Sequence, residues 1–166
     1  MAQLWVNLPA KDKKTPARYQ HLAKDNITVV PLADDAGHAR IIAGRFGNTD
    51  GAAETFTELN VWDIVLNGGA SADLDVPAGH NLMLVVLRGE VRINGGQSVQ
   101  ASQMATFERE SGSVKVEAVG GEAKILLLSG VPIDEPVVGY GPFVMNTEAE
   151  IAEVMNEFRS GKFGAV

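Results

Sequence analysis

The chain has 166 residues, enough for one domain or for one domain with an appendage, and its lack of cysteine excludes disulfides, thiol catalysis and thiolate metal sites. Its net charge of −7, without any cluster of lysine or arginine, argues against direct binding to nucleic acid. No apolar run approaches the roughly 20 residues that span a bilayer, and the N-terminus lacks a signal-peptide pattern, so we expect no membrane contact and a cytoplasmic location.

Short apolar segments separated by glycine or polar turns predict an all-β fold, because nothing alternates with helices as a parallel α/β sheet requires. The expected strands are 3–9, 27–32, 39–46, 59–66, 72–77, 82–87, 90–93, 97–100, 104–108, 113–119 and 123–129. Segments 82–87 and 125–128 are apolar at consecutive positions and should therefore lie inside a sheet. Asp73 and Asp75 alternate with apolar residues, and we interpret them as a solvent-facing strand side rather than as a catalytic pair.

One helix is expected, over residues 147–160. Thr147 and Glu150 have the spacing of a capping box, and Gly161 supplies a stop. An apolar stripe follows at helical spacing: Ile151, Val154, Met155 and Phe158. We expect this stripe to pack on the chain's own barrel, with a partner-binding helix as the alternative.

Several segments carry a family resemblance. Short glycine-bounded strands around P-x-G-H and R-G-E-V resemble the cupin motif, a jelly-roll barrel. Longer stretches resemble the pirin family of the cupin superfamily: QLWVNLPAKDKKTPARYQ (3–20), PAGHN (77–81), EPVVGYGPFVMNTEAEI (135–151) and SGKFG (160–164). The resemblance implies an all-β, RmlC-like cupin jelly-roll β-barrel with a C-terminal α-helix.

The resemblance covers only part of a pirin, since members usually have two cupin barrels in tandem and this chain is similar to the second. It implies three parts: an N-terminal strand and linker (1–26) equivalent to the end of a missing first barrel, a C-terminal cupin barrel (27–145), and a helix with its tail (146–166). In the family the first barrel holds the iron site, to which quercetin 2,3-dioxygenase activity of some members is assigned. Its His-Pro-His-Arg-Gly motif is absent from this sequence.

His80 precedes the strand 82–87 and is the natural candidate for a metal ligand. A mononuclear cupin site needs an H-x-H pair, a glutamate a few residues on and a later histidine, so that several side chains converge on one ion. The alternate position after His80 is Leu82, and the other histidines, His21 and His38, lie in early polar stretches. We expect a turn histidine that hydrogen-bonds its own loop or points to solvent, and we assign no catalytic, cofactor-binding or metal-ligating residue and no cofactor.

Two further predictions concern a possible pocket at Trp62 and an ion pair of Glu90. Trp62 lies on an apolar alternation face of strand 59–66 and is expected in the core, with a small pocket lined by Trp62 and His80 as the alternative. Glu90 is expected to pair with Arg88 or Arg92 at the barrel rim.

Three functions stay open. The first is a metal-free protein-binding or regulatory domain without its own catalysis, whose protein partner the sequence does not identify. The second is a quercetin 2,3-dioxygenase-like enzyme with a metal site supplied by another subunit. The third is a small-ligand binder that uses the barrel interior.

The N-terminal segment predicts a homodimer. Leu4, Trp5, Val6 and Leu8 would form an apolar edge strand, a remnant of the first barrel with no barrel to complete. We expect it to add to a sheet edge of its own barrel or of a second copy.

Overall fold

The structure, a computed structural model, describes residues 2–109 and 112–163. The chain forms two compact units. The barrel unit is Tyr19–Pro132, and the terminal unit combines Met1–Arg18 with Ile133–Val166. The boundaries that we predicted after residues 26 and 145 stay predictions.

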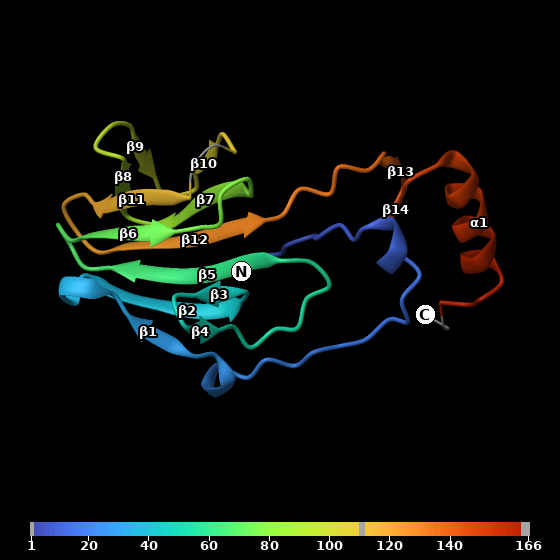
Figure 1. Ribbon diagram of the computed structural model, residues 1–166, viewed down its shortest axis with the longest axis horizontal. Helices are drawn as coiled ribbons and strands as arrows, with labels where there is room; N and C mark the ends of the chain where they lie inside the picture. Colours follow the sequence, from blue (N-terminus) through green and yellow to red (C-terminus); the bar gives the residue numbers. More distant parts are fainter. Residues whose placement is uncertain (1, 110–111, 164–166) are drawn as a thin grey trace. The chain divides into compact units, whose positions relative to one another are not determined.

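The barrel unit consists of two antiparallel sheets and a small hairpin (Figure 1). The six-stranded sheet has the order β1 (Val29–Pro31), β2 (Gly37–Ala43), β5 (Leu59–Leu66), β12 (Ala123–Gly130), β7 (Asn81–Arg88) and β10 (Met104–Phe107). The four-stranded sheet has the order β6 (Ser71–Asp75), β11 (Ser113–Ala118), β8 (Glu90–Ile93) and β9 (Ser98–Gln100). The hairpin joins β3 (Arg45–Phe46) to β4 (Thr49–Asp50), and two 3-10 turns, Lys24–Asn26 and Ala33–Asp35, complete the unit. This is the all-β cupin barrel that the sequence predicts.

The core lies between the two sheets and follows the alternation of their strands. From the six-stranded sheet, Leu84 and Leu127 are fully buried, and Leu74 and Val116 meet them from the four-stranded sheet. Trp62 is 1% exposed and packs edge-on against Phe46, with ring centroids 4.9 Å apart. Trp62 is therefore a core residue, as its alternation pattern predicts. Full burial of one large aliphatic side chain stabilises a fold by about 1.5–3 kcal/mol.

The outward faces of the two sheets differ in composition. Strand alternation and register place only polar residues outward on the four-stranded sheet: Ser71, Asp73, Asp75, Glu90, Arg92, Ser98, Gln100, Ser113, Lys115 and Glu117. The same alternation places large apolar residues outward on the six-stranded sheet, among them Val29, Val61, Val65, Met83, Val85, Met104, Leu126 and Leu128. We call this second surface the apolar face.

The terminal unit is built on a hairpin and a helix. Strands β13 (Val138–Tyr140) and β14 (Phe143–Met145) pair, and helix α1 (Glu148–Arg159) packs against both. A 3-10 turn, η1 (Ala10–Asp12), belongs to the N-terminal segment of the same unit. The sequence predicts the helix correctly, whereas the expected strands do not include this hairpin.

The apolar stripe of α1 is only partly buried. Ile151 is buried, whereas Phe158 is 52% exposed and contacts the Phe143 ring at 5.8 Å between centroids. Within its unit the helix packs on β13 and β14, so docking of the stripe on the barrel stays a prediction. Because the Phe158 ring is half exposed, the large cost of truncating a fully buried phenylalanine does not apply to it.

The predicted strand at residues 3–9 is absent, since residues 2–9 contain no strand. Trp5 is 76% exposed, Leu4 and Val6 are also exposed, and Leu8 is half-buried. Instead of joining a sheet, the segment is held by Lys13, whose Nζ donates to Asn7 Oδ1 at 2.7 Å and to the Val144 carbonyl at 3.2 Å. Apolar composition favours a strand, but a strand also needs a neighbour whose backbone groups pair with it.

Candidate functional site

A small polar layer closes one end of the barrel core. Asn60 and Trp62 are the first two residues of β5 that point into the barrel. The first of these buried side chains is therefore an amide rather than a hydrocarbon. Asn60 Nδ2 donates to Ser129 Oγ of β12 at 2.9 Å, and Asn60 Oδ1 accepts the Arg45 backbone N–H at 2.9 Å. Both ends of the buried amide are therefore satisfied, which fixes the β3–β4 hairpin against β5.

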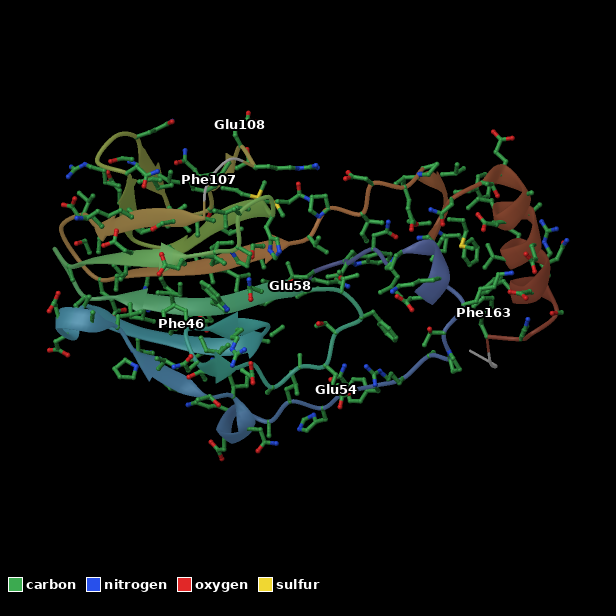
Figure 2. The ribbon with its side chains drawn as sticks, viewed as in Figure 1. Phe46, Glu54, Glu58, Phe107, Glu108 and Phe163 are labelled. Atoms are coloured by element: carbon green, nitrogen blue, oxygen red, sulfur yellow. The ribbon has the colours of Figure 1, made fainter. Side chains whose placement is uncertain are left out.

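A cavity of about 680 Å³ opens beside this layer. Its walls come from the β3–β4 hairpin, from the start of β5 with Glu58 (Figure 2), and from the end of β6. Asp50, Glu58 and Asp75 contribute carboxylates, whereas Arg45 is the one cation of the lining and lies 3.4 Å from Asp50. The cavity therefore suits a ligand that donates hydrogen bonds or carries positive charge, and it does not suit an anion.

His80 is buried in the barrel unit, with a side chain that is 5% exposed. Its backbone N–H donates to the Pro77 carbonyl at 3.4 Å, but its Nδ1 has no partner and its Nε2 lies 3.9 Å from Glu58 Oε1. Of the two arrangements that we predicted, a ring that points to solvent is therefore wrong, and the hydrogen bond within its own loop is made by the backbone N–H rather than by the ring. The ring shares the inward side of β7 with Leu82, so alternation carries it into the barrel rather than out to water.

The iron that the cupin fold implies does not fit these residues. Within residues 2–109 and 112–163, no group of three or more histidine, cysteine or acidic side chains is placed to hold a metal ion. The carboxylate of Glu58 lies near His80, and the next inward positions of the strand are Leu82 and Leu84. One imidazole and one exposed carboxylate are too few donors for a mononuclear iron site.

A charged trio stands in the middle of the apolar face. Asp63 of β5 has a nearly buried side chain, and its Oδ2 lies 3.3 Å from Arg40 Nη1 of β2 and 3.1 Å from Lys124 Nζ of β12. The two cations thus compensate a carboxylate that the surrounding valines and leucines would otherwise desolvate without a partner. Sequence reasoning missed this trio, although a lone aspartate inside the apolar strand VWDIVL was the available signal.

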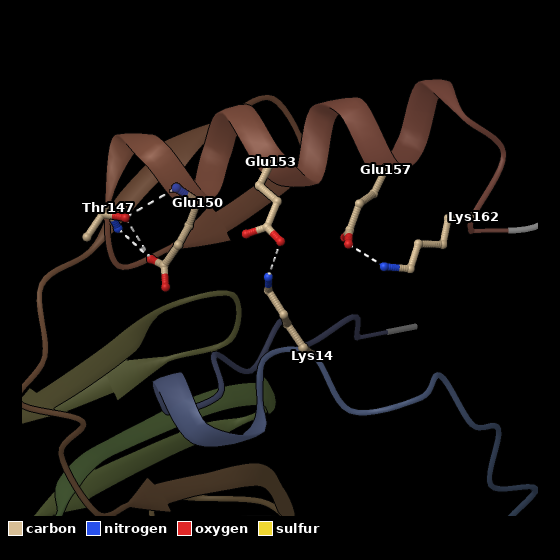
Figure 3. A network of polar contacts seen from close by, with 6 residues as sticks. All are labelled: Lys14, Thr147, Glu150, Glu153, Glu157 and Lys162. Atoms are coloured by element: carbon tan, nitrogen blue, oxygen red, sulfur yellow. Dashed lines mark hydrogen bonds and ion pairs between the residues drawn. The ribbon is translucent and has the colours of Figure 1, made fainter.

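The terminal unit is held by a polar network (Figure 3). At the start of α1 the Glu150 N–H donates to Thr147 Oγ1, and Glu150 Oε2 accepts the Thr147 N–H at 2.8 Å. This is the predicted capping box. Hydrogen bonding to Thr147 lowers the pKa of Glu150. The hydrogen bond that Lys14 Nζ donates to Glu153 Oε1 at 2.7 Å raises the pKa of Lys14. The Lys14–Glu153 pair ties the N-terminal segment to the helix.

A shallow groove lies within the terminal unit, with a volume of about 310 Å³. It is lined by Trp5, Val6, Asn7, Leu8, Lys13, Pro142 and Val144. Three of the four residues predicted for a dimer strand, Trp5, Val6 and Leu8, therefore lie together along a groove. The structure contains one copy of the chain, so their role in a dimer stays a prediction.

The predicted pocket of Trp62 and His80 also stays a prediction. Both side chains are buried, and neither lines the cavities described above. The rim pairing predicted for Glu90 is replaced by cross-strand pairs, because Arg88 bonds Glu122 and Arg92 lies 3.2 Å from Glu117. No helix in the described ranges combines the length and the apolar character that a membrane crossing demands.

Comparison with known proteins gives the chain its relatives. The Pirin C-terminal cupin domain matches residues 61–164. A Pseudomonas aeruginosa protein named "Putative quercetin 2,3-dioxygenase" is 45% identical over 163 residues, which are 98% of this chain and 56% of that protein. A "Pirin-like protein" from Caulobacter vibrioides is 35% identical over 163 residues, covering 97% of this chain and 58% of that protein.

A solved structure agrees with these sequences. The crystal structure of quercetin 2,3-dioxygenase from Acinetobacter baumannii superposes with a TM-score of 0.91 at 43% identity, over 97% of this chain and 56% of that one. The chain spans a little more than half the length of these relatives. Sequence and fold agree, and the chain belongs to the pirin family, in which it corresponds to the C-terminal cupin domain.

Proposed function

We propose that this chain is a pirin-type cupin domain that acts through protein contact and has no metal centre of its own. The apolar face carries the proposal. Large apolar side chains such as Val85, Met104 and Leu128 point outward from the six-stranded sheet, whereas the outward side of the four-stranded sheet is polar throughout. An apolar surface of this extent marks a contact site in most soluble proteins.

The donor chemistry of the barrel supports the absence of catalysis. Around His80 the described residues offer that imidazole and the exposed carboxylate of Glu58, whereas an iron site needs three or four converging ligands. The sequence contains no cysteine, which suits the reducing cytoplasm that we propose as its compartment.

Metal analysis and an activity assay test the catalytic half of the proposal. Untagged protein, dialysed against a chelator, is expected to contain far less than one equivalent of iron by mass spectrometry and to consume no oxygen with quercetin. Iron near one equivalent per chain would contradict the proposal.

Affinity capture tests the contact half. Partners captured from the native cell by the wild-type chain are expected to be lost with Leu128→Lys on the apolar face. They should be retained with Ser113→Lys on the polar face, where the same lysine is added to an exposed strand position. Equal capture by all three proteins would exclude the apolar face as the contact site.

A second candidate is a quercetin 2,3-dioxygenase that is completed by a metal-bearing barrel on another subunit. The relatives' names favour it, since the Pseudomonas and Acinetobacter proteins carry that activity in their names and extend well beyond the part matched here. Mixing this chain with the separately expressed first half of the Pseudomonas relative tests it. Oxygen uptake with quercetin that rises on mixing, above that of the first half alone, would favour this candidate.

The third candidate is binding of a small ligand in the barrel. The cavity beside Asn60 favours it, because its carboxylates suit a cationic or hydroxyl-rich ligand. Calorimetric titration with amines and polyols, compared between wild type and Asp75→Asn, would show binding that depends on the lining.

A further inference from the structure

The apolar face needs a cover that the barrel unit does not supply. Strands β7 and β12 are apolar at consecutive positions, so each has one apolar side in the core and one pointing outward. Among the described residues of the barrel unit the helical elements are two three-residue turns, Lys24–Asn26 and Ala33–Asp35, which are too short to cover a sheet. Sheets with both sides apolar are normally covered on both sides.

The size of the face matches a whole protein surface rather than a peptide. At about 3.3 Å per residue and about 4.8 Å between strands, the six strands have a flat footprint of about 600 Å². A standard stable interface buries about 800 Å² of accessible surface on each partner, and a face studded with side chains has more accessible surface than its footprint. The footprint therefore approaches the area that each partner buries in a stable dimer.

The charge of the face permits the approach of a second copy. Two chains that each carry a net charge of −7 repel one another over most of their surface. The polar face holds four outward carboxylates, Asp73, Asp75, Glu90 and Glu117, against two cations. On the apolar face Asp63 is the one outward carboxylate of the strands, and Arg40 and Lys124 compensate it. Repulsion between copies is therefore smallest here.

We infer that a second copy of this chain packs its apolar face against the first, so that the protein is a two-fold symmetric dimer. This inference rests on the proposed function, since it names the partner of the same contact surface. Face-to-face sheets pack about 10 Å apart with strands inclined by about 30°, and a two-fold axis brings the same patch together from both copies. Val85 of β7 and Leu128 of β12 form the centre of that patch, whereas Leu126, the register partner of Val85, is only 6% exposed.

Light scattering on purified protein at tens of micromolar tests the inference. Wild type is expected at twice the 17.6 kDa of one chain. Val85→Lys and Met104→Lys should be monomeric, because each places a charge on the apolar face. Met104 is 55% exposed on the edge strand β10, so its replacement leaves the folded barrel intact. Ser113→Lys, which adds the same charge to the polar face, should stay dimeric.

Two results would overturn the inference. One is a monomeric wild-type protein. The other is a dimer that survives both Val85→Lys and Met104→Lys but dissociates with Trp5→Ala, which would transfer the contact to the groove of the terminal unit. If wild type is monomeric but Leu128→Lys still abolishes capture of another protein, the proposed function holds and the second copy is not the partner.

Discussion

The outward sides of the two sheets show how similar strands can serve different surroundings. Strand β11 alternates Val114 and Val116 with Lys115 and Glu117, so one side enters the core and the other meets water. The outward positions of strand β12 include Leu126 and Leu128, whereas the outward positions of β11 include charged residues. The inward sides are equally apolar, so the core does not require this difference. The outward composition instead depends on what lies outside the barrel, and for β12 our proposal is that another protein surface lies there.

The largest expected effect is a difference in unfolding free energy between substitutions on the two sides of β12. Leu127 is fully buried and faces the core, while its neighbour Leu128 faces outward and is half-buried. Leu127→Ala should lower the free energy of unfolding by about 2–5 kcal/mol, because it leaves a cavity in packed surroundings.

Leu128→Ala should cost less than about 1 kcal/mol in dilute solution and more as protein concentration rises, since dimer formation stabilises the fold by mass action. Urea unfolding at two protein concentrations measures both variants. Equal losses at low concentration would contradict the inward and outward assignment.

A second comparison uses two aspartates on opposite faces. Asp63 is compensated by Arg40 and Lys124 on the apolar face, whereas Asp73 is exposed on the polar face. Asp63→Asn should cost about 1–3 kcal/mol, because the charged hydrogen bonds of two cations are lost. Asp73→Asn should change stability by less than about 0.5 kcal/mol. Chemical denaturation measures the unfolding free energy of the two isosteric variants. Similar losses in both would mean that the trio of Asp63, Arg40 and Lys124 is not shielded from water.

A third change tests whether the apolar face acts independently of the terminal unit. Thr147→Ala removes the hydroxyl that accepts the Glu150 N–H, and loss of such a cap costs about 1 kcal/mol of helix stability. The helical circular dichroism signal should therefore melt at lower temperature. Light scattering should still show a dimer, because α1 lies outside the barrel unit. Dissociation of the dimer by this variant would place the contact in the terminal unit.

The smallest expected effect is a pH dependence confined to the helix. Hydrogen bonds to Thr147 lower the pKa of Glu150 from its ordinary value of 4.5. A carboxyl with a lowered pKa stabilises the folded state above its unfolded pKa, and this stabilisation is lost as the pH falls through the folded value.

Helical signal should accordingly weaken on acidification below about pH 4.5. Glu150→Gln should weaken that dependence, because an amide oxygen still accepts the Thr147 N–H but does not titrate. A pH titration followed by circular dichroism compares the two proteins. An unchanged titration curve in Glu150→Gln would mean that another carboxyl governs the helix.

Local patterns were sufficient to predict much of the fold. The bounds of β5 and β8 coincide with the predicted strands 59–66 and 90–93, and Thr147 caps the helix as its spacing indicates. These features depend on alternation or on residues three apart, which a single sequence displays directly.

The remaining features depend on contacts between distant parts of the chain. Arg92 pairs with Glu117 because β8 and β11 are neighbours in register, and the two residues are 25 positions apart. His80 is buried because β7 turns its inward side to the core, which the sequence PAGHN does not reveal. Residues 3–9 have the composition of a strand but lack a neighbouring strand to pair with. Register and strand order are set by the whole fold and not by local composition.

The most direct test of the apolar face as the contact surface compares methyl groups in one sample. Methyl-labelled protein would be exposed to a neutral soluble paramagnetic chelate at low and at high micromolar concentration, and the relaxation of Val85, Leu128 and Val6 would be followed. Val85 and Leu128 should become protected as concentration rises, while the accessibility of the exposed Val6 of the terminal unit should not change. Protection of Val6 without protection of Val85 and Leu128 would contradict the account.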